Sequence, residues 1–274
     1  MSKELRMALI DSHVHTVLCR HAEGEVADFL AAASEAGLAG LAFTDHAPAP
    51  CGYDARHRMP LDQFSVYEQM VSRSRSGGYA GEVLFGIEAD YYEGFESFLP
   101  SWLKSQPFDV VLGSVHYIGS WGFDNPDNLE GWRGADVAGV WRRYFDLVGR
   151  MVDTGIYDVV AHLDLPKKFG HRPPESSIRE MAAPLLDRIS RAGMAIELNT
   201  SGLRRPAAEI YPSVLILSLA RERGIPICFG SDAHRPFEVG FGFSEAVRSA
   251  REAGYSDCVV FRQRRKHVCP LPVV

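Results

Sequence analysis

Short apolar runs alternate with stretches of helical periodicity along the chain, and no other feature of the sequence limits the fold so strongly. Continuous apolar runs of this kind are typical of parallel strands that are buried on both faces. The sequence contains seven of them, at residues 8–10, 38–43, 83–87, 108–112, 157–161, 195–198 and 225–229.

The helical stretches lie between these runs, at residues 26–36, 62–75, 137–152, 178–192, 214–223 and 244–253. Several are followed by a glycine, as helix C-termini commonly are, at Gly37, Gly77, Gly155, Gly193, Gly224 and Gly254. This repetition within 274 residues predicts one α/β domain, residues 1–274, folded as a closed or nearly closed parallel barrel. Residues 258–261 are expected to form a last edge strand. The basic run at 262–266 is expected to be a solvated tail and not a binding patch.

The charge balance argues against some classes of binding partner. Lys and Arg number 29 against 35 Asp and Glu, and the net charge is -6, so no basic surface for nucleic acid or anionic membrane is expected. Residues 1–7 lack an apolar stretch long enough for a signal peptide, and no run approaches a transmembrane span, which predicts a cytoplasmic protein. The cysteines lack CxxC spacing, which argues against a disulfide framework or a thiolate zinc site; they are Cys19, Cys51, Cys228, Cys258 and Cys269.

Imidazole and carboxylate side chains gather where the strands are expected to end. Seven of the ten histidines lie at these points or in the loop just beyond. In a parallel barrel the carboxyl ends of the strands converge on one face, so these groups are expected to line one cavity. Neutral imidazole suits zinc, iron and manganese, and a carboxylate can bridge two ions. The candidate metal ligands are His13, His15, His21, His46, Glu88, His116, His162, Asp232 and His234.

Each candidate has an ordinary structural explanation when it is taken alone. The histidines of a lone HxH motif can be hydrogen-bonded polar residues, Glu88 can form an ion pair, and Asp232 can cap a helix. Their shared placement at successive strand ends favours metal ligation. Nine ligand-type side chains exceed what one ion binds, so two or three adjacent ions are expected, with zinc, iron and manganese all left open. His57, His171 and His267 lie outside the pattern and are expected to be surface or loop residues.

These residues and their flanking sequences resemble the polymerase and histidinol phosphatase (PHP) superfamily over essentially the whole chain. A more specific resemblance, to the stand-alone histidinol-phosphate phosphatases, is carried by residues 43–48, 162–170, 197–204 and 231–236. The resemblance implies a distorted seven-stranded, TIM-like (β/α)7 barrel with three divalent metal ions at the carboxyl ends of the strands. Carried over by position, it implies one ion at His13, His15, Glu88 and Asp232, a second at Glu88, His116 and His162, and a third at His21, His46 and His234.

The expected reaction is hydrolysis of a phosphate monoester by a metal-activated hydroxide, without a side-chain nucleophile. Glu88, Asp232 and His234 are predicted to be catalytic, and the resemblance implies L-histidinol phosphate, a small molecule of histidine biosynthesis, as the substrate. Asp45 and Asp164 are candidates either to orient ligating imidazoles or to cap helices. The candidates for phosphate binding are Arg204, which is preferred, and Arg205, Lys167, Lys168 and Arg235.

Other functions stay open at this point. The nearest is another phosphomonoesterase or phosphodiesterase of the same family that acts on a nucleotide or small phosphate ester. Proofreading exonuclease chemistry is disfavoured by the acidic net charge. A non-enzymatic metal-binding module is disfavoured by the complete ligand set, and an amidohydrolase is expected to carry a strand-borne lysine. Oligomeric state does not follow from the sequence.

Overall fold

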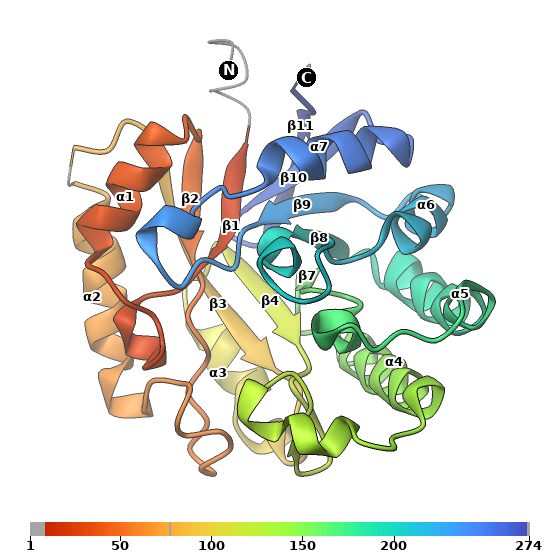
Figure 1. The fold of residues 1–274 in the computed structure, drawn as a ribbon. Helices are drawn as coiled ribbons and strands as arrows, with labels where there is room; N and C mark the ends of the chain where they lie inside the picture. Colours follow the sequence, from red (N-terminus) through yellow and green to blue (C-terminus); the bar gives the residue numbers. More distant parts are fainter. Residues whose placement is uncertain (1–8, 77, 273–274) are drawn as a thin grey trace.

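The structure is a computed structural model that describes residues 9–76 and 78–272. The predictions made for residues 1–8 and for Gly77 lie outside this part of the chain. A parallel sheet of seven strands forms its centre, in the order β1-β2-β3-β4-β7-β8-β9 (Figure 1). Each predicted apolar run contributes one strand, so the predicted barrel is confirmed. The strands are β1 (Ile10–Val14), β2 (Gly40–Phe43), β3 (Glu82–Asp90), β4 (Val110–Ser114), β7 (Val159–Val160), β8 (Ala195–Asn199) and β9 (Ile227–Gly230).

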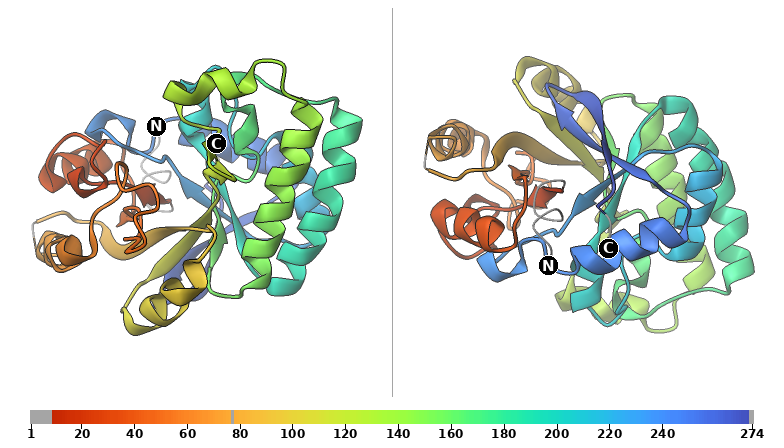
Figure 2. Two further views of the ribbon diagram at one scale, coloured as in Figure 1. Left: turned by 90° about the horizontal axis from the view of Figure 1, so that it is seen from below. Right: turned by 90° about the horizontal axis from the view of Figure 1, so that it is seen from above.

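The first and last strands, β1 and β9, lie side by side and nearly close the barrel (Figure 2). Val14 pairs with Ala233, just beyond β9, in a parallel bridge, and the backbone N–H of His15 donates to the carbonyl of Ala233 over 2.9 Å. The buried carboxylate of Asp11 accepts hydrogen bonds from the backbone N–H of Ser231 over 2.9 Å and from its hydroxyl over 2.5 Å. This closure brings together the two strand ends that carry candidate ligands.

Within the described residues, α-helices cover the outside of the sheet. Six of them were predicted, and α3 was not, because its seven residues make only about two turns and show no clear periodicity. Helices α1 and α2 lie together on one flank of the barrel, and α4 and α5 lie on the opposite flank (Figure 2). The helices are α1 (Val26–Glu35), α2 (Phe64–Ser74), α3 (Leu99–Ser105), α4 (Val137–Asp153), α5 (Glu175–Ala192), α6 (Val214–Glu222) and α7 (Phe243–Glu252).

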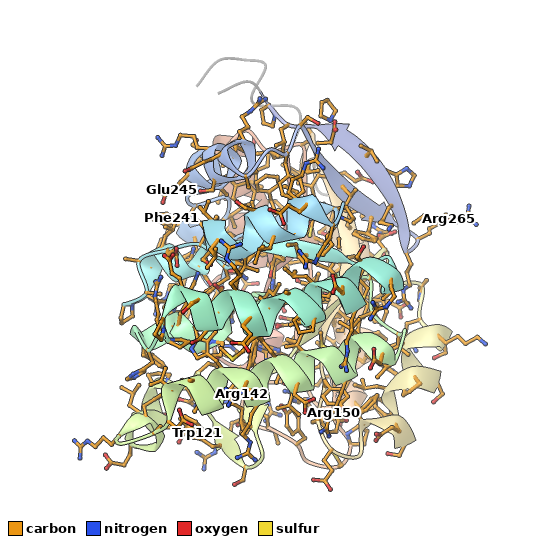
Figure 3. The ribbon with its side chains drawn as sticks, turned by 90° about the vertical axis from the view of Figure 1, so that its right-hand side faces the viewer. Trp121, Arg142, Arg150, Phe241, Glu245 and Arg265 are labelled. Atoms are coloured by element: carbon orange, nitrogen blue, oxygen red, sulfur yellow. The ribbon has the colours of Figure 1, made fainter. Side chains whose placement is uncertain are left out.

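An antiparallel hairpin of β10 (Asp257–Arg262) and β11 (Arg265–Pro270) packs into one end of the barrel. Val259, Val260 and Phe261 of β10 join the apolar cluster that fills the barrel interior. Arg265, at the turn of this hairpin, and Trp121, in the short hairpin of β5 (Tyr117–Ile118) and β6 (Trp121–Gly122), lie at opposite ends of the molecule (Figure 3). The β10–β11 hairpin therefore fills the amino end of the barrel.

The predicted edge strand and basic tail are corrected by this hairpin. Residues 257–262 do form a strand, but it pairs with β11 and not with the barrel. Two of the four basic residues pair with carboxylates of the barrel, Arg262 with Glu82 over 2.6 Å and Arg264 with Asp158 over 2.9 Å, whereas Arg265 and Lys266 are exposed, as expected of a solvated run. These ion pairs explain why the basic run folds back along the barrel.

Short elements cover the carboxyl end of the barrel. Among the described residues, no helix is both long and apolar enough to cross a bilayer. The short elements are β5 (Tyr117–Ile118), β6 (Trp121–Gly122), and the 3-10 turns η2 (Val17–Cys19), η3 (Leu61–Gln63), η4 (Phe95–Ser97), η5 (Pro126–Trp132), η6 (Leu165–Phe169), η7 (Thr200–Arg204) and η8 (Pro236–Glu238).

Candidate metal centre

All nine candidate ligands lie together at the carboxyl ends of the strands. Side-chain alternation at the end of β1 directs His13 and His15 to the same side, and both are fully buried. Glu88 lies within β3, and most of the others lie in segments that directly follow a strand. A cavity of about 520 Å³ opens at this end, and the candidates that line it are His21, His46, Glu88, His116, His162, Asp232 and His234.

Glu88 occupies the centre of the cluster. Its Oε1 lies 3.1 Å from Nε2 of His162 and 3.5 Å from Nε2 of His116. Its Oε2 lies 3.2 Å from Nε2 of His13 and 3.1 Å from Nδ1 of His46. Each carboxylate oxygen thus faces a different set of imidazoles, which is the arrangement a carboxylate needs to bridge two cations.

The imidazoles of His13 and His15 approach each other through their Nε2 atoms, which are 3.1 Å apart. Nδ1 of His13 donates to Oε1 of Glu197 over 2.7 Å, so the neutral ring carries its lone pair on Nε2. Oδ1 of Asp232 lies 3.4 Å from Nε2 of His15. Lone pairs and carboxylate oxygens that face each other at this range repel unless a proton or a metal ion lies between them. The ligand atoms of His13, His15 and Glu88 all lie within 4.8 Å of one another, close enough to share one ion.

A second group of imidazoles shows the same feature nearer the mouth of the cavity. The Nε2 atoms of His21 and His234 are 2.8 Å apart. Nδ1 of His21 donates to the carbonyl of Cys19 over 2.8 Å, and Nδ1 of His234 to the carbonyl of Asp232 over 3.0 Å. In the neutral rings, two Nε2 lone pairs therefore point at each other. With His46 they form a three-imidazole group of the kind that binds zinc and related ions, so these residues fit divalent metals.

The charges inside the cluster favour ligating forms at several positions. Burial disfavours the ionised form of Glu88, but neighbouring imidazoles, His46 first, hold its pKa well below the ordinary value. Burial and the neighbouring His46 lower the pKa of His21 to about 3. Burial also opposes protonation of His116, but Asp90 outweighs it and raises the pKa of His116 to about 10. Glu88 is thus ionised and His21 neutral at pH 7, whereas a metal ion has to displace a proton from His116.

The backbone is strained at two of the candidate ligands. His162 has a φ of 27° and Asp232 a φ of 53°, values that non-glycine residues rarely adopt. Such strain persists only where the surrounding structure holds it, and it concentrates at functional sites. The backbone at these two strand ends is therefore held so that both side chains reach the cavity.

The predicted phosphate-binding cations differ in where they lie. Lys168, Arg204, Arg205 and Arg235 line the cavity. Lys167 does not: its buried ammonium lies between two carboxylates, 2.8 Å from Asp164 and 2.7 Å from Glu209, and donates to a backbone carbonyl over 2.7 Å. The prediction for Lys167 is corrected, because these partners already use its three N–H donors.

Some N–H groups of the Arg204 guanidinium make no hydrogen bond. Its Nη2 donates to the carbonyl oxygens of Ser231, over 2.9 Å, and Asp232, over 3.3 Å, which anchors the guanidinium beside the candidate ligands. Its Nε lies 3.4 Å from Oε1 of Glu238, an ion-pair contact without a hydrogen bond, and its buried Nη1 makes no hydrogen bond within the described part of the chain. Buried N–H groups without a partner are costly, so this guanidinium suits an anion in the cavity.

The carboxylates that support the imidazoles are mostly not the predicted ones. Asp45 lies 3.6 Å from Nδ1 of His15, beyond a hydrogen bond. Asp164 pairs with Lys167 and accepts from the backbone N–H of Ser213, directly before α6, so of its two candidate roles the orienting one is not seen. Asp90 and Glu197 are the residues that contact imidazoles directly. A signal was available for both: Asp90 is two residues from Glu88 and therefore faces the same side of β3, and Glu197 is a carboxylate inside an apolar run.

His57 is a loop residue, as predicted, but it also contacts the site. It lines the cavity, its ring centroid lies 5.3 Å from that of His21, and its Nδ1 is 2.8 Å from Oδ1 of Asp54. Tyr117 lines the cavity as well, and its hydroxyl donates to the same Asp54 oxygen over 2.9 Å. Spacing along the chain could not reveal this, since residues 54 and 57 reach the cavity through a loop.

The fold and the site define a class of protein: a parallel βα barrel with clustered metal-ligand side chains at the carboxyl ends of its strands. The PHP domain model matches residues 11–201, and the PHP-associated model matches residues 215–253. The chain belongs to the PHP domain family.

Individual relatives agree with this assignment. The chain is 44% identical over 259 residues to a protein of Deinococcus radiodurans named "Probable histidinol-phosphatase", covering 94% of this chain and 98% of that relative. It is 28% identical to the histidinol-phosphatase of Bacillus subtilis, covering 85% of this chain and 96% of that one. A histidinol phosphate phosphatase of Lactococcus lactis, solved in complex with zinc, L-histidinol and phosphate, has the same fold, with a TM-score of 0.82 at 20% identity over 95% of this chain and 99% of that one.

Proposed function

We propose that the protein is a histidinol-phosphatase, which hydrolyses L-histidinol phosphate to L-histidinol and phosphate with divalent metal ions. The identity of 44% to the Deinococcus radiodurans relative, across nearly the full length of both chains, supports the substrate. The observation that carries the chemistry is the position of Glu88, whose two oxygens face separate sets of imidazoles. That geometry supports a centre of more than one ion.

Three ion positions are proposed, with zinc, iron or manganese as the metal. Within each of two groups, His13–His15–Glu88 and His21–His46–His234, the ligand atoms lie within 4.8 Å of one another, which supports one ion at each group. For the remaining position, Nε2 of His162 and of His116 both lie within 3.5 Å of the same Glu88 oxygen. The proposed ligand sets are His13, His15, Glu88 and Asp232; Glu88, His116 and His162; and His21, His46 and His234.

When bound, such ions lower the pKa of water and offset negative charge on a phosphate group. Glu88 and Asp232 place carboxylate oxygens against this centre, and His234 points Nε2 toward it with Nδ1–H held by a carbonyl. These three are the proposed catalytic residues.

Arg204 is proposed to bind the phosphate through Nη1, which has no partner among the described residues, and through Nε, which makes no hydrogen bond but lies 3.4 Å from Oε1 of Glu238. A guanidinium can give a phosphate two parallel charge-assisted hydrogen bonds. Lys168 lines the same cavity and is proposed to give the phosphate a second cationic contact; its ammonium lies 3.0 Å from Asp124. Arg235, which is more exposed, also lines the cavity and is proposed to contribute in the same way. Together these cations favour a monoester dianion.

The experiment is a substrate panel on metal-defined protein. Purified protein is stripped by chelation, reloaded separately with zinc, manganese or iron, and assayed for phosphate release. L-histidinol phosphate is compared with phosphoserine, AMP and p-nitrophenyl phosphate, and bound metal is counted by elemental analysis. We expect L-histidinol phosphate to have the highest kcat/KM, with no turnover in the stripped protein. Preferential turnover of another ester would reassign the substrate, and full activity without metal would reject the chemistry.

A further inference from the structure

Glu197 is a buried carboxylate that the resemblance did not assign to the site. It lies on β8 and is inaccessible to solvent. Its Oε1 accepts a hydrogen bond from Nδ1 of His13 over 2.7 Å. Its Oε2 accepts from the backbone N–H of His162 and from Nδ2 of Asn199, each over 3.0 Å. One carboxylate thus contacts residues from the ends of three separate strands.

We propose that Glu197 is a positioning residue of the metal centre, which holds His13 with its proton on Nδ1 and thereby increases the affinity of the centre for divalent metal. This inference rests on the proposed metal-dependent function. A ligating imidazole whose second nitrogen donates to a carboxylate is fixed in one tautomer and orientation, and it becomes a more basic ligand. His13 meets this condition, because its Nε2 faces Glu88 and His15 while its Nδ1 faces Glu197.

The charge of Glu197 points to the same role. Within the described residues, no Lys or Arg nitrogen lies within 4.0 Å of its carboxylate, and its one ion-pair partner is His13. A buried carboxylate is costly without a compensating cation. A metal ion held at Nε2 of His13 would supply such charge through the imidazole.

Gly230 provides an independent observation. A Cβ at this position would overlap Oε1 of Glu197 and would lie 2.7 Å from Cβ of His13. The absence of a side chain at the end of β9 therefore leaves the space that the Glu197–His13 pair occupies. The contact is built from both strands, since β8 supplies the carboxylate and β9 makes room for it.

The test compares Glu197→Gln with Asp158→Asn. Both substitutions neutralise a carboxylate of the barrel, but Asp158 pairs with Arg264 of the hairpin at the other end. Zinc affinity is measured by chelator competition, fold stability by urea unfolding of the metal-free proteins, and the hydrogen bond at Nδ1 of His13 by 15N NMR of zinc-loaded protein. Metal affinities typically fall about 10–100-fold when such a partner is removed. We expect this loss in Glu197→Gln, with a shifted Nδ1 resonance of His13 because the charge-assisted hydrogen bond is lost, and unchanged zinc affinity in Asp158→Asn.

Zinc affinity within twofold of wild type in a folded Glu197→Gln protein would overturn the proposal, and so would an equal loss in both variants. If Glu197→Gln does not fold, two other measurements still test the proposal. Gly230→Ala keeps the carboxylate but displaces it, and should weaken zinc binding similarly. In the wild-type protein with zinc, His13 should carry its proton on Nδ1; a proton on Nε2 rejects the proposal. Wild-type zinc binding and phosphate release are measured separately, so the proposed function can hold while this inference fails.

Discussion

Removal of the Arg204 guanidinium should affect the reaction and not the metal content. The structure leaves Nε and Nη1 of Arg204 buried and without hydrogen bonds among the described residues, although Nε lies 3.4 Å from Oε1 of Glu238, whereas Nη2 is used by backbone carbonyls. If the phosphate takes two charge-assisted hydrogen bonds of about 1.5–3 kcal/mol each, Arg204→Met forfeits about 3–6 kcal/mol. At about 1.4 kcal/mol per factor of ten, kcat/KM should fall roughly 10²–10⁴-fold. The side chain is only 13% exposed, so solvent screens these contacts little.

Arg204→Lys refines the same prediction. A lysine keeps the charge but lacks the planar fork, so it should recover only part of the loss. The matched control is Arg205→Met, because Arg205 is adjacent, lines the same cavity and is exposed. The assay is steady-state phosphate release from L-histidinol phosphate, with inhibition by inorganic phosphate as a binding measure and elemental analysis of every variant.

Two results would refute the reasoning about Arg204. One is a kcat/KM for Arg204→Met within threefold of wild type at full metal content. The other is an equal loss in Arg205→Met, which would show that general positive charge matters and not the unpartnered donors. A loss of metal in Arg204→Met would instead indicate that its bonds to the Ser231 and Asp232 carbonyls hold the ligand loop.

Three further predictions concern the buried Lys167, the Phe261 ring inside the barrel, and the release of protons when metal binds. Lys167→Met should cost about 3–5 kcal/mol in urea unfolding because it leaves the buried carboxylate of Asp164 without a cation, and kcat/KM of the folded protein should be retained. Lys168→Met should instead weaken phosphate inhibition with little change in stability. Phe261→Ala should lower the free energy of unfolding by about 3–5 kcal/mol without changing metal content, since this ring fills the barrel interior. Metal binding at pH 8 should release protons, because the pKa of His116 is about 10 in the metal-free protein. The release is measured by calorimetry in buffers of different ionisation enthalpy. The apparent metal affinity should therefore rise with pH, and Asp90→Asn should reduce the number of protons released. Metal binding without proton release at pH 8 would contradict that assignment.

The barrel and the gathering of the candidate ligands could be predicted from the sequence because both follow from local patterns. Apolar runs and helical periodicity define the strands and helices, and parallel strands place their carboxyl ends on one face. His13 and His15 project together because side chains alternate along a strand. Residues such as His162 and Asp232 could therefore be placed beside them without knowledge of any contact.

The partners of those residues could not be predicted in this way. The separation of Lys167, enclosed by carboxylates, from Lys168, at the cavity, depends on the path of one short turn. The contact of Glu197 with His13 joins residues 184 positions apart, and it requires the space left at Gly230. Strand period and composition are properties of neighbouring residues, whereas hydrogen bonds and buried charge pairs depend on which distant side chains packing brings within about 3 Å.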